Sequence, residues 1–425
     1  MRGTPLKSDS YLVKLTVRDR ANGTETVDVP IPVQRSNPPK LSFVPMKPCR
    51  VMETRAGYNF EGRSGSFGPP FLGGMETRTL TLPASNVCEI PEAAQAYVLN
   101  VTAIPRGTLD YVAVYAGDES QPQLRTVSSP DGQIVANSAL VRAGSGGTVK
   151  VFASHDTDVL MDISGYFTGP GSNTGLLYYP VTPCRAVETR AQYRTAGMFG
   201  PPSLNAGETR RFRLPDSPWC ALPQGAAAYS ATITVVPKGP LPYLTMWPSG
   251  TAQPNVSSIN SFAGRVLANS VILPAAADGS IDVFAFDRTD LLIDINGYFA
   301  PDDGVKGLFF VPVVPCRITH HLYSSSIGNE GIRGLPLGAS KCAYVPLSVK
   351  AHALHVTAMP AGSPLPFLTL YPTGEERPNA SFLNAFEGQT VTNSAIVRVE
   401  AGGGASLFAY RATNLIVEWV GYFTR

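Results

Sequence analysis

The most suggestive charged side chains follow a cysteine near the start of a repeated segment. Arg50, Glu53 and Arg55 lie close together directly after Cys49. A carboxylate held between two guanidinium groups could act as a general acid or base, or it could belong to a structural ion-pair cluster. One copy of the segment lacks both the acid and the second arginine, so chemistry that needs them would be missing there. We therefore favour an ion-pair cluster beside a disulfide.

Histidines and aspartates are further candidates for chemistry. Four of the five histidines lie in the last third of the chain: His320, His321, His352 and His355. His352 and His355 are three residues apart, which on a strand places them on opposite faces. Two pairs of aspartates could bind calcium, although turn capping is the simpler role: Asp156 with Asp158, and Asp278 with Asp282. The sequence contains no nucleophile elbow, zinc-protease helix or phosphate loop, so we predict no enzyme activity, no cofactor and no metal.

Aromatic side chains near corresponding turns offer a different kind of site. Exposed aromatic rings can stack on sugars, and five candidates have suitable positions: Tyr111, Tyr243, Trp247, Phe367 and Tyr371. The alternative is that these rings pack in a core or between domains. A basic run at 210–213 is more simply a solvated strand face than a binding patch.

Composition limits the class of protein. The chain has 425 residues, enough for three domains, and 44% of them are hydrophobic. Charged residues are 16%, below the roughly 25% of typical soluble domains, and the net charge of +2 gives no argument for nucleic-acid binding. The 40 Gly and 38 Pro residues show no collagen period, which favours short strands and tight turns. No apolar run is long enough to predict membrane insertion.

Three segments repeat one pattern of motifs. Each opens with Pro-Cys-Arg, at 48–50, 183–185 and 315–317, and each closes with Gly-Tyr-Phe, at 165–167, 297–299 and 421–423. An Asn-Ser pair lies between them, at 137–138, 269–270 and 393–394. The third copy keeps Arg317 but has His320 and Leu322 in place of the acid and the second arginine. A unit of about 125 residues is far longer than a solenoid repeat, which indicates duplication of a whole domain.

Each copy carries one further cysteine. The repeat predicts three disulfides, each within one copy: Cys49–Cys88, Cys184–Cys220 and Cys316–Cys342. Buried free thiols are the alternative, and no C-x-x-C pair indicates a metal. Disulfides persist in oxidising compartments, so we expect a secreted protein, outside the cell or on its surface. Residues 1–10 contain no apolar signal-peptide core, so we expect the export signal to lie upstream or to have been removed.

Short alternating stretches, such as 77–82 and 111–115, predict about eight strands per copy and no amphipathic helix. Such strands with frequent turns are typical of a β-sandwich or a Greek-key barrel. We predict an all-β chain with three tandem, disulfide-stapled β-sandwich domains of Greek-key or Ig-like type, at 41–168, 177–300 and 307–425. Short linkers suggest that the copies sit in a row. We expect backbone amides to bind the acid before each Gly-Tyr-Phe: Asp162, Asp294 and Glu418.

The ordered motifs Pro-Cys-Arg-x-x-(acid)-Thr-Arg, Asn-Ser and Asp-x-x-Gly-Tyr-Phe support a family resemblance. The pattern resembles a domain that occurs in tandem in secreted proteins of soil and environmental bacteria, often beside Ig-like domains. The resemblance covers residues 41–425. It implies export and a modular surface architecture, and it implies no catalytic residues, because that family has no assigned activity.

Residues 1–38 contain a two-strand pattern of their own. Apolar residues alternate on both sides of an Asn-Gly turn signal and would share one face: Tyr11, Val13, Leu15, Val17, Val27, Val29, Ile31 and Val33. This resembles the closing hairpin of an Ig-like domain. A lone hairpin is marginal in water, so its apolar face must dock on another surface. Pro30 and Pro32 lack an N–H on the same side, which predicts an edge strand.

Two accounts of the hairpin remain open. Either the rest of an Ig-like domain lies upstream, or the hairpin adds strands to a sheet of a neighbouring subunit. We predict a structural subunit of an extracellular filament, sheath or cell-surface layer, which assembles into a homopolymer through its N-terminal strands. The alternative is a carbohydrate-binding or adhesive surface module with polysaccharide as partner.

Overall fold

The structure is a computed structural model. It describes residues 9–425 except for these gaps: 19–22, 34–38, 170–174, 194–196, 322–325, 336, 338–341, 343–345, 347, 361–362 and 400–403. The described residues form strands and short 3-10 turns with no α-helix, which confirms the all-β prediction. Within these described residues, no helical segment is long and apolar enough to cross a membrane.

The described residues of each copy form eight strands in two four-stranded antiparallel sheets. The first copy has the sheets β3-β10-β5-β8 and β4-β9-β6-β7. Its strands are β3 (Ser42–Glu53), β4 (Thr77–Thr81), β5 (Ala94–Pro105), β6 (Leu109–Ala116), β7 (Val127–Ser129), β8 (Val135–Arg142), β9 (Thr148–Ala153) and β10 (Thr157–Thr168). Four 3-10 turns join them: η1 (Ala56–Tyr58), η2 (Gly65–Phe67), η3 (Leu82–Ala84) and η4 (Ser145–Gly147).

The other two copies repeat this strand order. The second copy has the sheets β11-β18-β13-β16 and β12-β17-β14-β15. Its elements are β11 (Leu177–Glu188), η5 (Ala191–Tyr193), η6 (Gly197–Phe199), β12 (Glu208–Arg213), η7 (Leu214–Asp216), β13 (Ala228–Pro237), β14 (Leu241–Pro248), β15 (Ile259–Ser261), β16 (Leu267–Pro274), β17 (Ser280–Ala285) and β18 (Thr289–Ala300). The third copy has the sheets β19-β26-β21-β24 and β20-β25-β22-β23. Its strands are β19 (Phe309–His321), β20 (Gly331–Leu335), β21 (Val349–Met359), β22 (Leu365–Pro372), β23 (Leu383–Ala385), β24 (Val391–Arg398), β25 (Ala405–Ala409) and β26 (Asn414–Thr424).

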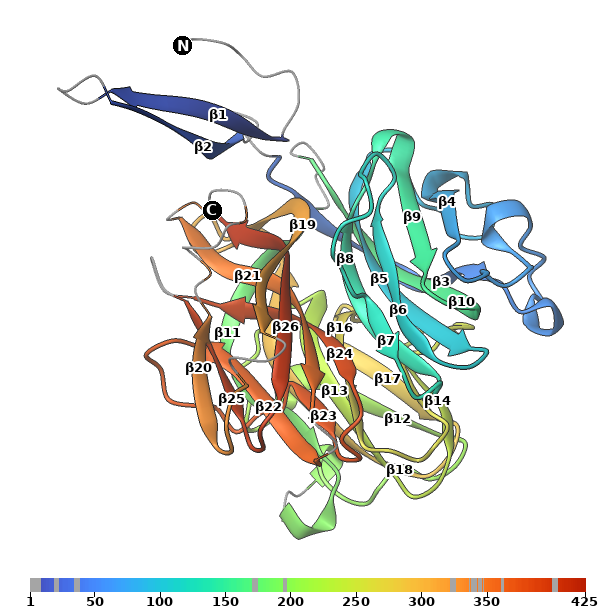
Figure 1. The fold of residues 1–425 in the computed structure, drawn as a ribbon. Helices are drawn as coiled ribbons and strands as arrows, with labels where there is room; N and C mark the ends of the chain where they lie inside the picture. Colours follow the sequence, from blue (N-terminus) through green and yellow to red (C-terminus); the bar gives the residue numbers. More distant parts are fainter. Residues whose placement is uncertain are drawn as a thin grey trace.

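The prediction of three tandem β-sandwich domains of Greek-key or Ig-like type is wrong. The six four-stranded sheets are arranged as the blades of a six-bladed β-propeller. Figure 1 shows that the three copies lie side by side around one centre instead of in a row. Each copy buries a hydrophobic cluster of its own, but a further cluster is shared by all three. This shared cluster favours the ring, because a row would leave its apolar surface in water.

Short β-bridges between the copies close the ring. Each bridge has a pair of reciprocal backbone hydrogen bonds, with N–O distances of 2.7–2.9 Å. The bridges join copy one to copy three, copy one to copy two, and copy two to copy three: Leu41 with Phe310, Phe43 with Leu176, and Tyr178 with Leu308. The segments between copies therefore take part in sheet-like pairing and are more than flexible connections.

An aromatic hub lies inside this triangle of bridges. It consists of six buried rings, two from each copy: Phe43, Phe167, Tyr178, Phe299, Phe310 and Phe423. Neighbouring ring centroids are 4.6–6.5 Å apart, mostly with tilted planes, which is the favourable range for aromatic pairs. The Phe of every Gly-Tyr-Phe motif thus packs at the centre of the molecule.

The glycine of the same motif makes room for the hub. A Cβ atom at these positions would lie 2.3–2.4 Å from a ring of the neighbouring first strand: Gly165 against Phe43, Gly297 against Tyr178, and Gly421 against Phe310. Only glycine permits so close an approach of ring to backbone.

A ring of asparagine and serine residues lies further along the same axis. The backbone N–H of each serine donates to the Oδ1 of an asparagine from another copy, at 2.9–3.1 Å: Ser138 to Asn269, Ser270 to Asn393, and Ser394 to Asn137. The three asparagines are completely buried. Each asparagine Nδ2 also donates to a backbone carbonyl of its own copy at 2.6–2.7 Å. The Asn-Ser motif therefore supplies buried hydrogen bonds that join each copy to the next.

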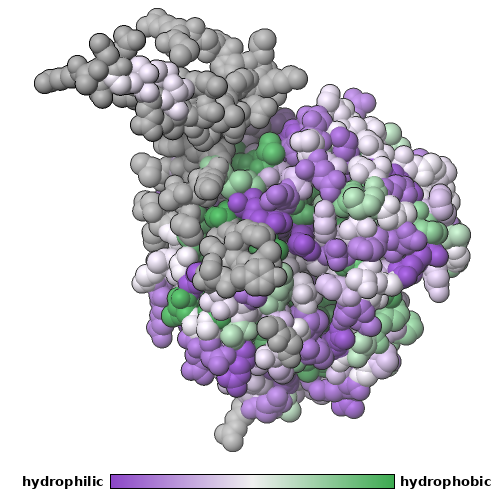
Figure 2. Space-filling view, viewed as in Figure 1, coloured by the Kyte–Doolittle hydropathy of each residue, from purple (hydrophilic) through white to green (hydrophobic). Residues whose placement is uncertain are grey.

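The N-terminal hairpin lies outside the six sheets (Figure 1). Strands β1 (Asp9–Arg18) and β2 (Thr24–Val33) pair in a ladder that places Val13 opposite Val29, and they pair with no other described strand. The turn at 19–22 and the side chains of the eight predicted assembly residues lie outside the described part of the structure. On the face of the ring seen in Figure 2, hydrophilic and hydrophobic residues are mixed.

We predict that Gly297→Ala destabilises the ring by about 1–3 kcal/mol, because the new Cβ would overlap the ring of Tyr178. The matched control is Gly225→Ala in the same copy, where the new Cβ would have no neighbour within 4 Å. Urea denaturation of both variants measures the difference. Equal stabilities of the two variants would contradict the packing described here.

Candidate functional site

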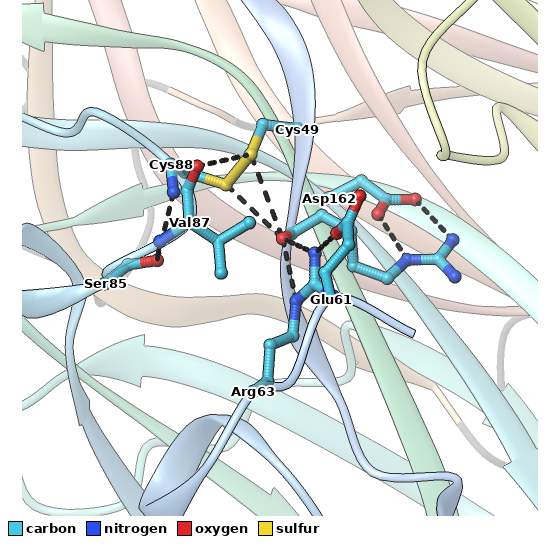
Figure 3. The surroundings of a disulfide bond; sticks show 8 residues. Cys49, Glu61, Arg63, Ser85, Val87, Cys88 and Asp162 are labelled. Atoms are coloured by element: carbon cyan, nitrogen blue, oxygen red, sulfur yellow. Dashed lines mark hydrogen bonds and ion pairs between the residues drawn. A yellow bond between two sulfur atoms is a disulfide. The ribbon is translucent and has the colours of Figure 1, made fainter. Parts of the chain in front are cut away.

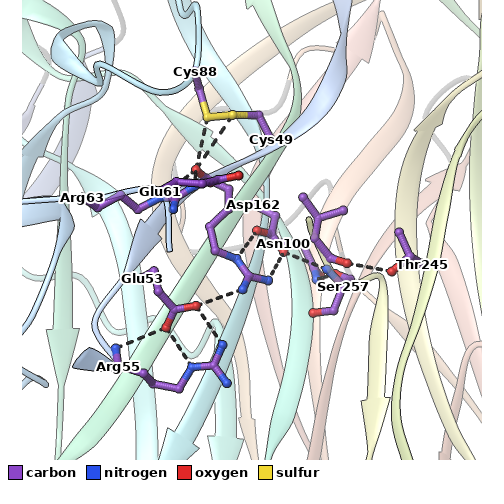
Figure 4. Close-up of polar contacts among 12 residues, drawn as sticks. Cys49, Glu53, Arg55, Glu61, Arg63, Cys88, Asn100, Asp162, Thr245 and Ser257 are labelled. Carbon is purple, nitrogen blue, oxygen red and sulfur yellow. Dashed lines mark hydrogen bonds and ion pairs between the residues drawn. A yellow bond between two sulfur atoms is a disulfide. The ribbon is translucent and has the colours of Figure 1, made fainter. Parts of the chain in front are cut away.

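The charged residues singled out from the sequence form one buried cluster beside the first disulfide (Figure 4). The Arg50 guanidinium contacts two carboxylates, with Nε 2.8 Å from Asp162 Oδ1 and Nη1 2.9 Å from Glu53 Oε2. Glu53 also binds Arg55 Nη2 at 2.8 Å. The second copy repeats these contacts at 2.8–2.9 Å with Arg185, Asp294, Glu188 and Arg190.

The charged groups of the cluster are buried and bonded to one another. Burial alone would lower the pKa of Arg50, but the carboxylates of Asp162 and Glu53 outweigh burial and raise this pKa above its ordinary value. The same balance raises the pKa of Arg185. Arg50, Glu53 and Asp162 are at most 7% exposed, and each carboxylate is already bonded, so a substrate could not reach them. Removal of one partner would leave a buried charge unpaired, which is strongly destabilising.

The acid before each Gly-Tyr-Phe motif reaches into the next copy. Its second oxygen accepts a backbone N–H at 3.1 Å in all three junctions: Asp162 from Ser257, Asp294 from Ser381, and Glu418 from Arg125. We predicted that backbone amides would bind these acids, but not that the amides would belong to another copy. The acids form a belt, which together with the Asn-Ser ring closes the cycle of copies.

The junction between copies three and one differs from the other two. Within the described residues Arg317 contacts one carboxylate, with Nη2 2.8 Å from Glu418 Oε1, and the side chains of 319–321 lie outside the described residues. His355 Nδ1 lies 3.2 Å from the Arg125 carbonyl oxygen, where Asn100 in copy one contacts the Ser257 carbonyl. Within the described part of the chain, three nitrogens here are buried without a hydrogen-bond partner: Arg125 Nε, Arg317 Nε and His355 Nε2.

All three predicted disulfides are confirmed: Cys49–Cys88, Cys184–Cys220 and Cys316–Cys342. In the first copy, Arg63 Nε donates to the Arg50 carbonyl at 2.9 Å, and Ser85 Oγ accepts the Cys88 N–H at 3.3 Å (Figure 3). The Cys49–Cys88 disulfide and these hydrogen bonds thus hold the strand that carries Arg50 and position the ion-pair cluster.

The residues considered for metal binding have other roles. Asp156 accepts the Gly74 N–H, Asp158 pairs with Arg106, Asp278 binds Ser280, and Asp282 pairs with Arg211. His352 and His355 lie on opposite faces of β21, since His352 contacts the Trp419 ring and His355 the Arg125 carbonyl. Among the described residues no group of three or more His, Cys, Asp or Glu could hold a metal ion.

The five aromatic candidates fall into two groups. Trp247 and Tyr371 are only 3% and 4% exposed, and Trp247 Nε1 donates to the Thr251 carbonyl at 3.0 Å, so neither ring is available to a ligand. The other three are partly exposed and pair with a Phe on the neighbouring strand, with centroids 5.5–5.8 Å apart: Tyr111 with Phe152, Tyr243 with Phe284, and Phe367 with Phe408. We call these three pairs the aromatic shelves.

The shelves lie on the opposite side of their sheets from the core of their own copy, and in copy one this side packs against the shared cluster, where Phe152 is buried. Strands alternate their side chains, and the next residue after each shelf ring is a buried core residue: Val112, Leu244 and Leu368. Copy two extends its shelf with Phe286, which is 47% exposed, and copy three places the Arg377 guanidinium 4.1 Å from the centroid of Phe408.

Comparisons with known proteins identify no relative. No family model matches the chain, and no curated protein matches it. A chain in the atomic structure of Sulfolobus turreted icosahedral virus aligns with 10% identity over 98% of this chain and 90% of its own length, with a TM-score of 0.18. A structure of the triple jelly roll fold and turret assembly of an archaeal virus gives 10% identity, 98% and 89% coverage, and a TM-score of 0.17. Scores this low carry no argument about fold or function.

Burial lowers the pKa of both His352 and His355 to about 4, below the ordinary value near 6.5. Between these two values the unfolded chain binds protons that the folded chain does not bind. The free energy of unfolding therefore falls as the pH falls from about 6.5 to 4.

We predict that His355→Asn reduces this acid sensitivity, because an asparagine side chain does not take up a proton in this pH range. Asn is chosen because copy one has it at the equivalent position 100. Between pH 7.5 and 4.5 the unmodified protein should lose about 2 kcal/mol more stability than the variant. Urea denaturation at both pH values measures the two losses. An identical pH dependence for both proteins would show that His355 is not buried and neutral.

Proposed function

We propose that this protein is a structural building block of an extracellular filament, sheath or cell-surface layer, with the N-terminal hairpin as its joint. The observation that carries this proposal is the division of the chain into a closed ring and a separate strand pair. The three copies are joined to one another by β-bridges, while β1 and β2 pair only with each other among the described strands. A strand pair with free edges is suited to pairing with another chain.

In the described part of the body, no sheet lacks a strand that its counterparts in the other copies have. Both sheets of every copy contain four described strands in the same order. A hairpin that filled a gap in a neighbouring ring would need such a gap, so donation of strands into the body is not the assembly mode that we propose. The hairpin would instead pair with strands outside the ring, from a second copy or from an upstream Ig-like portion.

The register of the hairpin indicates which edge is available. Leu12 lies opposite Pro30, and Ser10 lies opposite Pro32. Because proline has no N–H, these pairs must be the non-hydrogen-bonded ones, and both proline nitrogens face away from β1. The outer edge of β2 is therefore blocked, whereas the outer edge of β1 keeps its N–H groups and is the one that would accept another strand.

The stapled body fits an extracellular setting. Three disulfides favour an oxidising environment, and each one closes a loop within a copy. Closing loops of this size is worth about 3–4 kcal/mol per bond in the chain-entropy model. A body with one staple per copy and contacts in a closed cycle would suit a part that bears mechanical load.

We predict that the full chain self-associates and that Lys14→Pro abolishes the association, because this change removes an N–H from the outer edge of β1. A peptide of residues 8–36 should compete with association. Light scattering after size-exclusion chromatography and negative-stain imaging measure both effects, and circular dichroism checks that the ring stays folded. A chain that remains monomeric at all concentrations, or that associates equally well with Lys14→Pro, would contradict the joint.

A second candidate function is carbohydrate binding, and the aromatic shelves favour it. They occur at equivalent positions in all three copies, and Tyr111, Tyr243 and Phe367 are each partly exposed, as rings that stack on sugars must be. Their partners Phe152 and Phe408 are buried, whereas Phe284 in copy two is partly exposed. The shelf of copy two, with Tyr243, Phe284 and the exposed Phe286, is the widest target. In this account the ring would present three matched surfaces to one polysaccharide, and the gain would come from multivalency.

We predict that the double variant Tyr243→Ala and Phe286→Ala weakens pull-down on insoluble plant or bacterial cell-wall polysaccharide about tenfold. Trp247→Phe is the control, because Trp247 is buried and its ring is not on the open shelf. Retention of the unmodified protein equal to that of serum albumin would exclude this function for the shelves.

A further inference from the structure

Three matched turns meet where the central axis reaches the surface. Each turn joins two strands of one copy, β7 to β8, β15 to β16 and β23 to β24, and is closed by a backbone hydrogen bond of 2.9–3.0 Å to a glycine N–H. The three glycines, Gly132, Gly264 and Gly388, have φ values of +68° to +73°. This conformation favours glycine, so each turn has the same shape and presents the two residues before the glycine.

A hollow of about 40 Å³ lies between the turns, and all three copies line it. Its walls include the apolar side chains of Val135, Leu267 and Val391. Each of these residues lies two positions before an asparagine of the Asn-Ser ring on the same strand. We call this hollow with its three turns the axial mouth.

The copies differ in the side chains that they bring to the axial mouth. Copy two presents Phe262, which is 44% exposed and lines the hollow, and copy three presents Phe386, which is 39% exposed on the equivalent turn. Copy one has Pro130 at this place. Phe262 lines the hollow and Phe386 occupies the matching place on the turn of copy three, so exposed aromatic surface lies at the hollow and on the turn beside it.

Polar groups surround the same hollow. Arg265 of copy two pairs with Asp131 of copy one, and its Nε lies 3.7 Å from Glu387 Oε2 of copy three. Gln389 Oε1 accepts the Glu387 N–H at 3.1 Å, while its Nε2 is buried and, among the described residues, has no hydrogen-bond partner. A buried amide N–H of this kind needs an acceptor from a ligand or a water.

We propose that the axial mouth binds a neutral sugar residue of a glycan. The ring of the sugar would rest on Phe262 and Phe386, and an exocyclic hydroxymethyl group would enter the hollow, which is too small for a whole sugar. Its hydroxyl oxygen would accept the free N–H of Gln389. At the rim, the carboxylates could accept hydrogen bonds from further hydroxyls of the sugar, and the guanidinium could donate to them.

The chemistry of the mouth favours a neutral, hydroxyl-rich ligand over other classes. The charges at the rim are one guanidinium and two carboxylates that already contact it, so no strong field of one sign selects an ion. A purely apolar ligand would leave the Gln389 amide without a partner. This site is separate from the aromatic shelves; it extends the second candidate function and does not depend on the joint at the hairpin.

The test uses the full chain on an array of plant and microbial cell-wall oligosaccharides, followed by calorimetric titration of any oligosaccharide that binds. The double variant Phe262→Ala and Phe386→Ala should bind at least about tenfold more weakly, and Gln389→Ala should weaken binding without loss of stability. Trp219→Ala is the matched control, since it removes an equally exposed ring that belongs neither to the hollow nor to a shelf. Phe286→Ala reports separately on the shelf of copy two. Thermal unfolding verifies that every variant is folded.

The results separate the two carbohydrate sites. Loss of binding in the Phe262 and Phe386 double variant with normal binding in Phe286→Ala supports the axial mouth. Loss in Phe286→Ala alone overturns the axial mouth and leaves the shelves as the sugar site. Binding to no oligosaccharide on the array overturns the axial mouth, while self-association through the hairpin would still stand or fall by its own measurement.

Discussion

The structure depends on contacts that close a cycle around one axis. The Asn-Ser hydrogen bonds, the acid belt and the β-bridges all run from copy to copy and return to the first. A cycle of this kind constrains every member, because the third contact can form only when the first two have the correct geometry. Each buried polar group in it would cost about 1–3 kcal/mol if it were left without its partner. The aromatic hub adds burial, while the polar ring defines a single arrangement.

Local signals in the sequence predicted much of the fold. The strands, the three copies, the disulfide pairs and the hairpin each follow from alternation, spacing or turn residues within one segment. The ring could not be predicted in this way. Phe43 and Phe167 look like ordinary inward-facing strand residues, and nothing in their alternation says that a second, shared core exists. Asn137 is polar and precedes serine, which suggests a surface, yet it is completely buried.

The candidate sites were predictable to different degrees. The ion-pair cluster followed from Arg50, Glu53 and Arg55 together with the loss of two of these groups in copy three. Among the aromatic residues, Tyr243 and Trp247 are four residues apart on one strand, and only the loop that covers Trp247 distinguishes them. The axial mouth was missed because its residues come from three turns far apart in the sequence. The repeated Gly132, Gly264 and Gly388 were a signal that could have indicated those turns.

The short connections between the copies keep the ring together at low protein concentration. A trimer of separate subunits has a dissociation constant, and dilution into the surroundings would take it apart. Here the three partners belong to one polypeptide, so each finds the others at a high effective concentration however dilute the protein becomes. Covalent linkage also allows the three copies to differ in sequence, whereas the subunits of a homotrimer must be identical. One junction can therefore carry a histidine and another a second carboxylate without loss of the ring.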